Sequence, residues 1–224
     1  MTKIKKIILF SMFTNSLKYK IRTGWKDVRV SGRKESVAEH IYGTLMLAQV
    51  IMDQYDLKLD RAKVYEILMN HEIEEILMPD YSIRAKITRR EKIAQGKKSV
   101  NQATRMLNRQ KEIENLLDEF NARETPEAKF CYLIDKMECD FQAKIYDLRG
   151  SMSYQRMYED SLRYGSKKDS IRKESKTASD FWLEYDKSIF ANEPIFEELL
   201  NEIKLLTKED YQKVKKEIEG GIKC

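Results

Sequence analysis

Apolar residues recur at helical spacing along most of this 224-residue chain, and few residues interrupt the pattern. Only 8 glycines and 3 prolines occur, too few for a fold of many short strands joined by tight turns. Residues 36–55 show the spacing most clearly, with an apolar stripe formed by Val37, Ile41, Leu45, Ala48, Ile51 and Met52. No convincing strand and no internal repeat is found. The sequence therefore predicts an all-α fold, a single-domain helical bundle with one core.

Capping residues predict where two of these helices begin. Ser36 and Glu39 form a capping-box pattern, in which each side chain accepts a hydrogen bond from the other residue's backbone N–H. Asp60 is a suitable N-cap for a second helix. This second helix is expected to run to about Met78, because Pro79 would end it.

The middle of the chain predicts charged helices followed by a long buried one. Residues 88–120 are expected to form one or two charged helices, broken near Asn108. Thr125 and Pro126 suit the N-cap and the first position of a helix that extends to about Leu148. The side chains expected to face the core from this helix are those of Phe130, Ile134, Met137, Phe141 and Ile145.

The remainder of the chain is less regular. Residues 165–177 are polar and basic, which is typical of a mobile loop or a frayed helix end. Helices are expected again at residues 179–191, 195–206 and 208–218. We therefore divide the chain into an N-terminal helical extension packed on the domain (1–18), a domain core (19–150), a polar basic loop region (151–178) and C-terminal helices that complete the bundle (179–224).

The charge balance favours a small anionic substrate over a nucleic acid. The chain has 42 Lys and Arg against 37 Asp and Glu, a formal charge of +5 with both signs interspersed. Such a mild excess suits anionic ligands without requiring a nucleic acid. No nucleic-acid recognition motif is found, so no specific nucleic-acid partner is expected.

The three cysteines indicate a reducing compartment, and we expect a cytoplasmic protein. Their number is odd and no CxxC motif occurs. Cys131 and Cys139 flank Asp135 by four residues on either side, which makes them candidate metal ligands. Small buried hydrophobes are the preferred interpretation. The third cysteine is Cys224.

No membrane partner is expected from the sequence. Lysines followed by an apolar run over residues 3–13 faintly resemble a signal peptide. The run is too short, however, and no small-residue cleavage site follows it. No segment reaches the roughly 18 apolar residues that a membrane-spanning helix needs.

Only two histidines occur, and both lie beside acidic residues. His40 follows Glu39, and His71 precedes Glu72 and Glu75. His71 and Glu75 would share one face of the helix predicted there. Other helices carrying His40 and Asp135 could complete a mixed nitrogen and oxygen ligand set. Such a set suits one divalent ion among Mn²⁺, Co²⁺, Fe²⁺, Zn²⁺ and Mg²⁺.

The residues alone leave a structural interpretation open beside the metal site. A histidine at the edge of an apolar stripe is commonly a hydrogen-bonded core residue, and Glu39 could serve only as a cap. The acids that follow His71 could coat a solvated helix face. The HExxE pattern also lacks the second histidine of the HExxH zinc proteases, which argues against a peptidase of that type.

An ordered series of short motifs narrows this choice. The series is Arg22-Thr-Gly-Trp25, Glu35-Ser-Val-Ala-Glu39-His40, His71-Glu72-x-x-Glu75, Pro79-Asp80, Ala128-Lys-Phe130 and Asp135-x-x-Glu138. It resembles the HD-domain phosphohydrolases, closest to the 5′-deoxynucleotidase-like branch, over about residues 19–200. The resemblance implies a helical bundle of the HD-domain type around one divalent ion. It also implies a nucleotide substrate, and it makes a homodimer one arrangement to test, because family members are often dimers.

The resemblance assigns a role to each matching residue. His40, His71 and Asp135 match the family's metal ligands, and Glu72 stands where the family has its namesake aspartate. Glu75 matches an acid that handles protons near the attacking water. For substrate binding, the matching residues are Arg22 for the phosphate, Asp80 for the sugar and Trp25 for a wall of the sugar pocket.

The implied activity is hydrolysis of a (deoxy)nucleoside 5′-monophosphate to nucleoside and phosphate. Glu72 departs from the family pattern, which has an aspartate at this position. The extra methylene of glutamate displaces the carboxylate by about 1.3 Å, whereas metal–oxygen distances tolerate an error of only about 0.2 Å. Two alternatives therefore remain. One is hydrolysis of another nucleotide, namely a cyclic nucleotide, (p)ppGpp or a nucleoside triphosphate. The other is a catalytically impaired nucleotide-binding module.

Overall fold

The computed structural model of the protein describes residues 1–82, 84–162 and 167–221. Within these ranges the chain is helical and forms no β-strand, apart from one isolated antiparallel bridge between Ile21 and Ser36. The predicted all-α class is confirmed. The chain divides into two compact units, one comprising Met1–Asp27 with Lys34–Asp135 and the other Val28–Arg33 with Lys136–Cys224.

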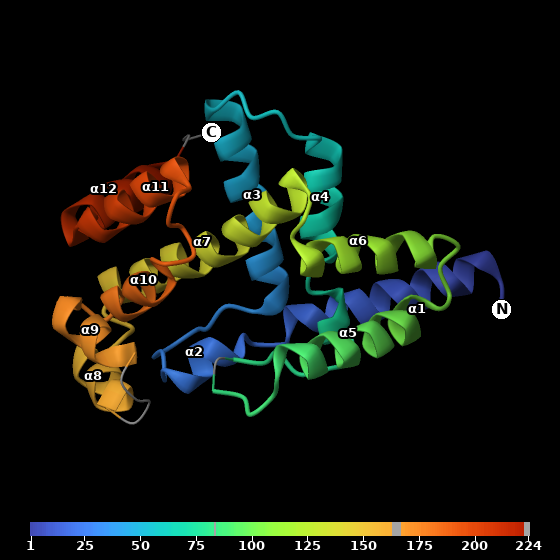
Figure 1. The fold of residues 1–224 in the computed structure, drawn as a ribbon, viewed down its shortest axis with the longest axis horizontal. Coiled ribbons are helices and arrows are strands. Elements are labelled where there is room, and N and C mark those ends of the chain that lie inside the picture. The colour runs from blue at the N-terminus through green and yellow to red at the C-terminus, as the bar shows by residue number, and fades with distance from the viewer. Residues whose placement is uncertain (83, 163–166, 222–224) are drawn as a thin grey trace. The chain divides into compact units, whose positions relative to one another are not determined.

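The first unit contains the elements that carry the sequence-predicted site. They are α1 (Lys3–Asn15), η1 (Ser16–Lys18), α2 (Thr23–Asp27), α3 (Val37–Gln54), α4 (Arg61–Asn70), η2 (Ile73–Ile76), α5 (Arg89–Thr104), α6 (Gln110–Ala122) and the first part of α7 (Pro126–Leu148). Helices α3 and α4 pack together, α6 packs on both α4 and α5, and α1 lies along α5 (Figure 1).

The predicted caps form at the start of both α3 and α4. The capping box at α3 is complete, with hydrogen bonds in both directions between Ser36 and Glu39. Asp60 accepts a hydrogen bond from the backbone N–H of Lys63. Helix α3 then buries one face, which carries Val37, His40, Thr44, Ala48, Ile51 and Met52.

The prediction that the second helix continues to Met78 is wrong. Helix α4 ends at Asn70, and Glu72 leaves the helical conformation at φ −116° before the short η2 turn. Distant side chains bind the carbonyls in this segment. Lys20 Nζ donates to the carbonyls of Glu75 and Met78, and Ser99 donates to that of Glu74. These tertiary hydrogen bonds replace those that a continued helix would make.

The long helix α7 begins where the sequence places it. Its first turn is capped by Thr125, whose hydroxyl accepts the N–H of Ala128 at 3.2 Å. Ile134 and Met137 are fully buried, but Phe141 is 40% exposed, so the core-facing role predicted for Phe141 is wrong. Past Met137 the buried face turns toward other positions on the helix, which carry Asp140, Ala143 and Lys144.

The predicted burial of the cysteines is confirmed for the two that the structure describes. Cys131 and Cys139 are both buried, and neither is part of a disulfide within the described residues. Cys131 packs with its sulfur 3.6 Å from the Val64 carbonyl, and burial raises the pKa of its thiol. Cys224 lies outside the described residues.

The second unit contains the rest of α7 followed by α8 (Tyr154–Leu162), α9 (Lys167–Glu174), α10 (Asp180–Asp186), α11 (Pro194–Leu205) and α12 (Lys208–Gly220). The predicted loop over residues 165–177 is therefore wrong for residues 167–174, while 165 and 166 lie outside the described residues. Arg172 stabilises α9 by donating to the Ser161 carbonyl at 3.0 Å, a contact with α8 that the local sequence pattern cannot show. The helix predicted for residues 179–191 ends earlier, at Asp186.

None of the helices in the described ranges combines the length and apolar character needed to cross a bilayer.

Candidate metal centre

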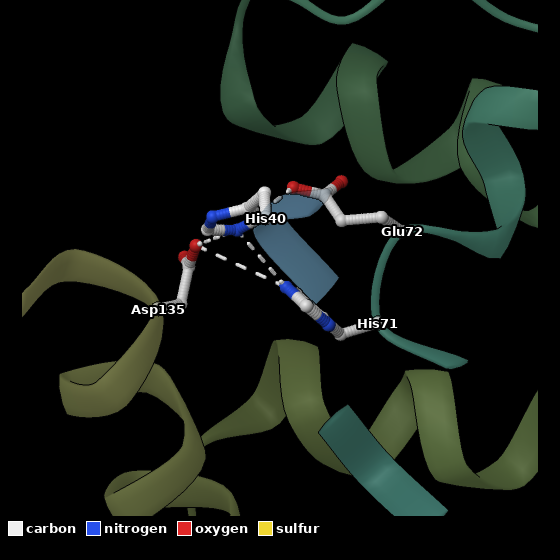
Figure 2. Close-up of side chains that lie close together, drawn as sticks. All are labelled: His40, His71, Glu72 and Asp135. Carbon is white, nitrogen blue, oxygen red and sulfur yellow. Dashed lines mark hydrogen bonds and ion pairs between the residues drawn. The ribbon is translucent and has the colours of Figure 1, made fainter. Parts of the chain in front are cut away.

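Four buried side chains from separate elements converge in the first unit (Figure 2). His40 comes from α3, His71 caps the end of α4, Glu72 precedes η2 and Asp135 lies in α7. His40 Nε2 lies 3.1 Å from Asp135 Oδ1 and 3.4 Å from His71 Nε2. The cluster therefore brings together the four residues that the sequence analysis named as ligand candidates.

The separations of these donor atoms fit a single ion. One ligand atom from each residue lies within 4.8 Å of the others. His40 Nε2 is 3.9 Å from Glu72 Oε1, and His71 Nε2 is 4.0 Å from Asp135 Oδ1. With metal–ligand bonds of about 2.1 Å, neighbouring donors lie about 3.0–3.4 Å apart and opposite donors about 4.2 Å apart. Two imidazoles and two carboxylates at these spacings could hold a divalent metal ion.

The protonation of His71 is suited to this role. Its Nδ1 lies 2.7 Å from the Leu68 carbonyl, which can only accept, so Nδ1 carries the proton. The lone pair on Nε2 is then directed into the cluster. Burial lowers the pKa of His71 and outweighs the opposing effect of the Glu72 and Asp135 charges, which favours the neutral imidazole that metals bind.

Glu72 is held in its charged form at the edge of the cluster. Arg22 Nη1 donates to Glu72 Oε1 at 2.6 Å, and both side chains are largely buried. Burial opposes ionisation, but the positive charges of Arg22 and Lys92 favour it, and the pKa of Glu72 is lowered to about 2. The longer acid at this position thus faces His40 and Arg22 with the same oxygen.

Glu75 has the opposite electrostatic environment. Its side chain is 1% exposed, and among the described residues neither of its carboxyl oxygens has a hydrogen-bond partner. Burial raises the pKa of Glu75 to about 10, with further contributions from the negative charges of Glu72 and Asp80. Glu75 therefore carries a proton at neutral pH in this environment, close to the metal-ligand candidates.

Comparison with known proteins settles the family. The HD domain family model matches residues 14–179, about three quarters of the chain. This chain belongs to the HD domain family. It is 28% identical over 145 residues to the human 5′-deoxynucleotidase HDDC2, covering 64% of this chain and 69% of the relative. It is 30% identical over 146 residues to HDDC2 of Dictyostelium discoideum, covering 62% of this chain and 76% of the relative.

Solved structures share the HD fold. A conserved hypothetical protein from Pyrococcus furiosus aligns with a TM-score of 0.64 at 20% identity, covering 89% of this chain and 99% of its own. An HD-domain phosphohydrolase from Listeria innocua aligns with a TM-score of 0.52 at 17% identity, covering 88% and 98%. At these identities the likeness establishes the fold alone.

A short backbone pairing helps to position Arg22 and Asp80. The cluster of His40, His71, Glu72 and Asp135 is called the HD cluster below. The N–H of Arg22 donates to the Glu35 carbonyl at 3.0 Å, and the N–H of Val37 donates to the Lys20 carbonyl at 2.8 Å. This pairing ties residues 20–22 to the start of α3. Asp80 is then joined to the same segment, because its Oδ2 accepts the N–H of Thr23 at 2.5 Å.

Trp25 lies in the core of the HD domain. Its side chain is 1% exposed, and its indole Nε1 donates to Glu35 Oε2 at 2.8 Å. This environment favours a packing role over contact with a sugar. Trp25 lies within α2, which directly follows Arg22. By fixing α2 in the core, the tryptophan would help to position Arg22.

Three residues near the HD cluster were missed by the sequence analysis. Lys20 binds the carbonyls of the segment that carries Glu75. The charge of Lys92 on α5 helps to lower the pKa of Glu72, and it opposes the rise that burial causes in the pKa of Glu74. Gly96 leaves room for Glu74, since a Cβ there would lie 2.9 Å from Glu74 Oε2. No local motif marks these positions, because each acts on residues far away in the sequence.

Proposed function

We propose that this HD domain protein is a metal-dependent phosphomonoester hydrolase that converts deoxynucleoside 5′-monophosphates to nucleoside and phosphate. The observation that carries the proposal is the set of four converging buried donors with Arg22 at its edge. The relatives from human and Dictyostelium discoideum, both named 5′-deoxynucleotidase, support the choice of substrate. No chemistry beyond phosphate ester hydrolysis is needed to explain this arrangement.

His40, His71, Glu72 and Asp135 would hold the one divalent ion. When bound, such an ion supplies Lewis acidity and lowers the pKa of water. Manganese, cobalt, iron, zinc and magnesium all accept a mixed set of nitrogen and oxygen ligands. The two carboxylates offset the charge of a divalent cation, while the neutral His71 contributes no net charge.

Arg22 would bind the substrate phosphate. A guanidinium carries five N–H donors in a planar fork, so Arg22 can keep Glu72 and still hold phosphate oxygens. Its side chain is 13% exposed, which gives a ligand limited access. A lysine would lack this planar fork, since its ammonium acts as a point charge and cannot hold two oxygens of one phosphate in the same fixed geometry.

Glu75 would supply the proton that the reaction needs at the leaving 5′-oxygen. Its raised pKa, about 10, means that its carboxyl holds a proton at neutral pH. A positioned acid of this kind typically contributes about 10²–10⁴-fold in rate. Asp80, held by the Thr23 N–H, would accept a hydrogen bond from a sugar hydroxyl.

Phosphate release tests the proposed activity. The purified protein would be assayed with dAMP, dCMP, dGMP and dTMP, and with the matching ribonucleotides, after loading separately with each candidate metal. Release from deoxynucleotides under at least one metal is the expected result. Folded protein that releases no phosphate from any of them under any metal contradicts the proposal.

A second function is favoured by one observation. Glu72 Oε1 is already bound to Arg22, so the site could have become a nucleotide-binding module with little turnover. The same samples distinguish the two functions. A nucleotide-dependent rise in melting temperature without phosphate release indicates the binding module.

A further inference from the structure

Helix α1 presents an apolar face to solvent. Ile4, Ile7, Ile8 and Met12 are 66%, 60%, 53% and 64% exposed, respectively. Their spacing of three and four residues places them on one side of the helix. Burying side chains of this kind is favourable, and their exposure together on one helix indicates a surface that binds something.

The opposite side of α1 is anchored to the first unit. Phe10 packs against the core cluster of Ile73, Val100 and Leu117. Helix α1 also contacts η2 and runs beside α5 (Figure 1). The apolar face is therefore held outward by a packed helix, and it does not depend on a loose segment folding back.

Lysines border this face on both sides. At about 100° per residue, Lys3 projects about 40° beyond Ile7, and Lys5 projects about 20° beyond Met12. Both lysines are exposed. Residues 1–26 contain seven Lys or Arg and no Asp or Glu, so the segment is strongly positive. The neighbouring α5 is also basic, with five Lys or Arg and one Glu.

We propose that the α1 face, defined by Ile4, Ile7, Ile8 and Met12, binds the surface of an anionic lipid membrane. An apolar helix face with basic edges lies in the headgroup region, with its apolar side chains at the acyl boundary. In the last turns of α1, the same side of the helix carries the polar residues Ser11 and Asn15. Polar side chains there suit a helix that lies at the depth of the lipid headgroups. Such binding at the surface needs no membrane-spanning helix, but it revises the expectation that the protein has no membrane partner.

Charge favours a lipid surface over a second copy of the chain. Two copies that paired through this face would bring lysines against lysines, with no carboxylate in α1 to offset them. Anionic headgroups supply the complementary charge. Each Lys or Arg near such a surface adds attraction, which falls off within a Debye length of about 10 Å.

Vesicle flotation tests the proposal on the full-length protein. Binding is expected to vesicles of phosphatidylcholine with about 30% phosphatidylglycerol, and to be weak with phosphatidylcholine alone. The double variants Ile7→Ser/Ile8→Ser and Lys3→Glu/Lys5→Glu should each lower the partition coefficient about tenfold. About 0.5 M NaCl should weaken binding of the wild type. The matched control is Val214→Ser/Ile218→Ser on α12, where the two side chains are 53% and 74% exposed, and it should bind like the wild type.

Three outcomes would overturn the proposal. One is a wild-type protein that does not float with anionic vesicles, and another is equal binding to neutral and anionic vesicles. The third is a dimer in light scattering that Ile7→Ser/Ile8→Ser converts to a monomer, which would assign the face to a second copy. Circular dichroism of each variant establishes that its helices are intact.

Discussion

Arg22 and Glu72 form an ion pair at 2.6 Å across 50 residues of sequence. The pair joins the arginine proposed for phosphate binding to the acid that departs from the family pattern. Since the same Glu72 oxygen lies 3.9 Å from His40 Nε2, the glutamate links the phosphate-binding residue to the metal-ligand candidates. The backbone at position 72 suits a glutamate, because the length of its side chain brings one oxygen near both Arg22 and His40.

Shortening this acid should therefore weaken the site. Glu72→Asp is expected to lower metal affinity by about tenfold, within the range seen when groups that orient a metal site are disturbed. The carboxylate would withdraw by about 1.3 Å from both Arg22 and His40. Equilibrium dialysis with metal analysis measures the change. Glu72→Gln, which keeps the length and removes the charge, serves as the comparison, and an unchanged affinity in Glu72→Asp would show that the length is immaterial.

Removing a histidine should release the metal. His71→Ala is expected to lose bound metal and phosphate release together, because it deletes a donor that the Leu68 carbonyl holds in the ligand tautomer. Elemental analysis of the purified variant checks this outcome. Asp53→Ala, at an exposed acid on α3, is the control and should retain metal. Full metal content in His71→Ala would remove the histidine from the proposed ligand set.

Glu75 should matter for turnover and not for metal retention. Glu75→Gln keeps the shape of the side chain and removes the transferable proton, so kcat is expected to fall by about 10²–10⁴-fold. Metal content and the binding of substrate should stay near the wild-type values. Steady-state kinetics alongside metal analysis separates these effects. A fully active Glu75→Gln enzyme would exclude the proposed proton-transfer role.

Lys20 should stabilise the segment that carries Glu72 and Glu75. Lys20→Met removes the ammonium that binds the Glu75 and Met78 carbonyls, and it should cost about 1.5–3 kcal/mol of unfolding free energy. Urea unfolding measures this loss. Lys20→Arg should recover part of it, since a guanidinium can still donate. Lys18→Met, at an exposed neighbouring lysine, is expected to be neutral.

The second unit offers a pH-dependent prediction at Asp140. Both of its carboxyl oxygens are buried, and the described residues provide neither with a hydrogen-bond partner. Burial, together with the charge of Asp186, raises the pKa of Asp140 well above its ordinary value, against a smaller lowering by Lys136. The folded state thus binds this proton more tightly than the unfolded state does. Stability is lost as pH rises from about 4 through the raised folded pKa.

Replacing Asp140 with asparagine, a neutral side chain of the same shape, should remove the loss of stability at higher pH. At pH about 8, Asp140→Asn is expected to exceed the wild type in unfolding free energy by about 1 kcal/mol or more and to melt at a higher temperature, whereas at pH about 3.5 the two should differ little. Calorimetry at both pH values provides the measurement. Asp53→Asn is the control at an exposed site. Equal melting temperatures of Asp140→Asn and the wild type at the higher pH would contradict the raised pKa of Asp140.

The sequence by itself determined the helical class, the starts of the main helices and the identity of the four ligand candidates. Caps such as Ser36, Asp60 and Thr125 act within one helical turn, so a few neighbouring residues are enough to recognise them. The histidines could be singled out because each lies beside carboxylates in the sequence.

Tertiary structure decided where α4 ends and what each polar side chain faces. Lys20 and Ser99 bind carbonyls of Glu75 and Glu74 in the segment that follows the helix, across 55 and 25 residues of sequence. The same long-range packing joins Arg22 to Glu72 and buries Trp25 against Glu35. Buried polar groups take whichever partners the fold brings within hydrogen-bonding distance. Local sequence patterns carry no information about those partners, so the motifs could identify the site's residues without giving their arrangement.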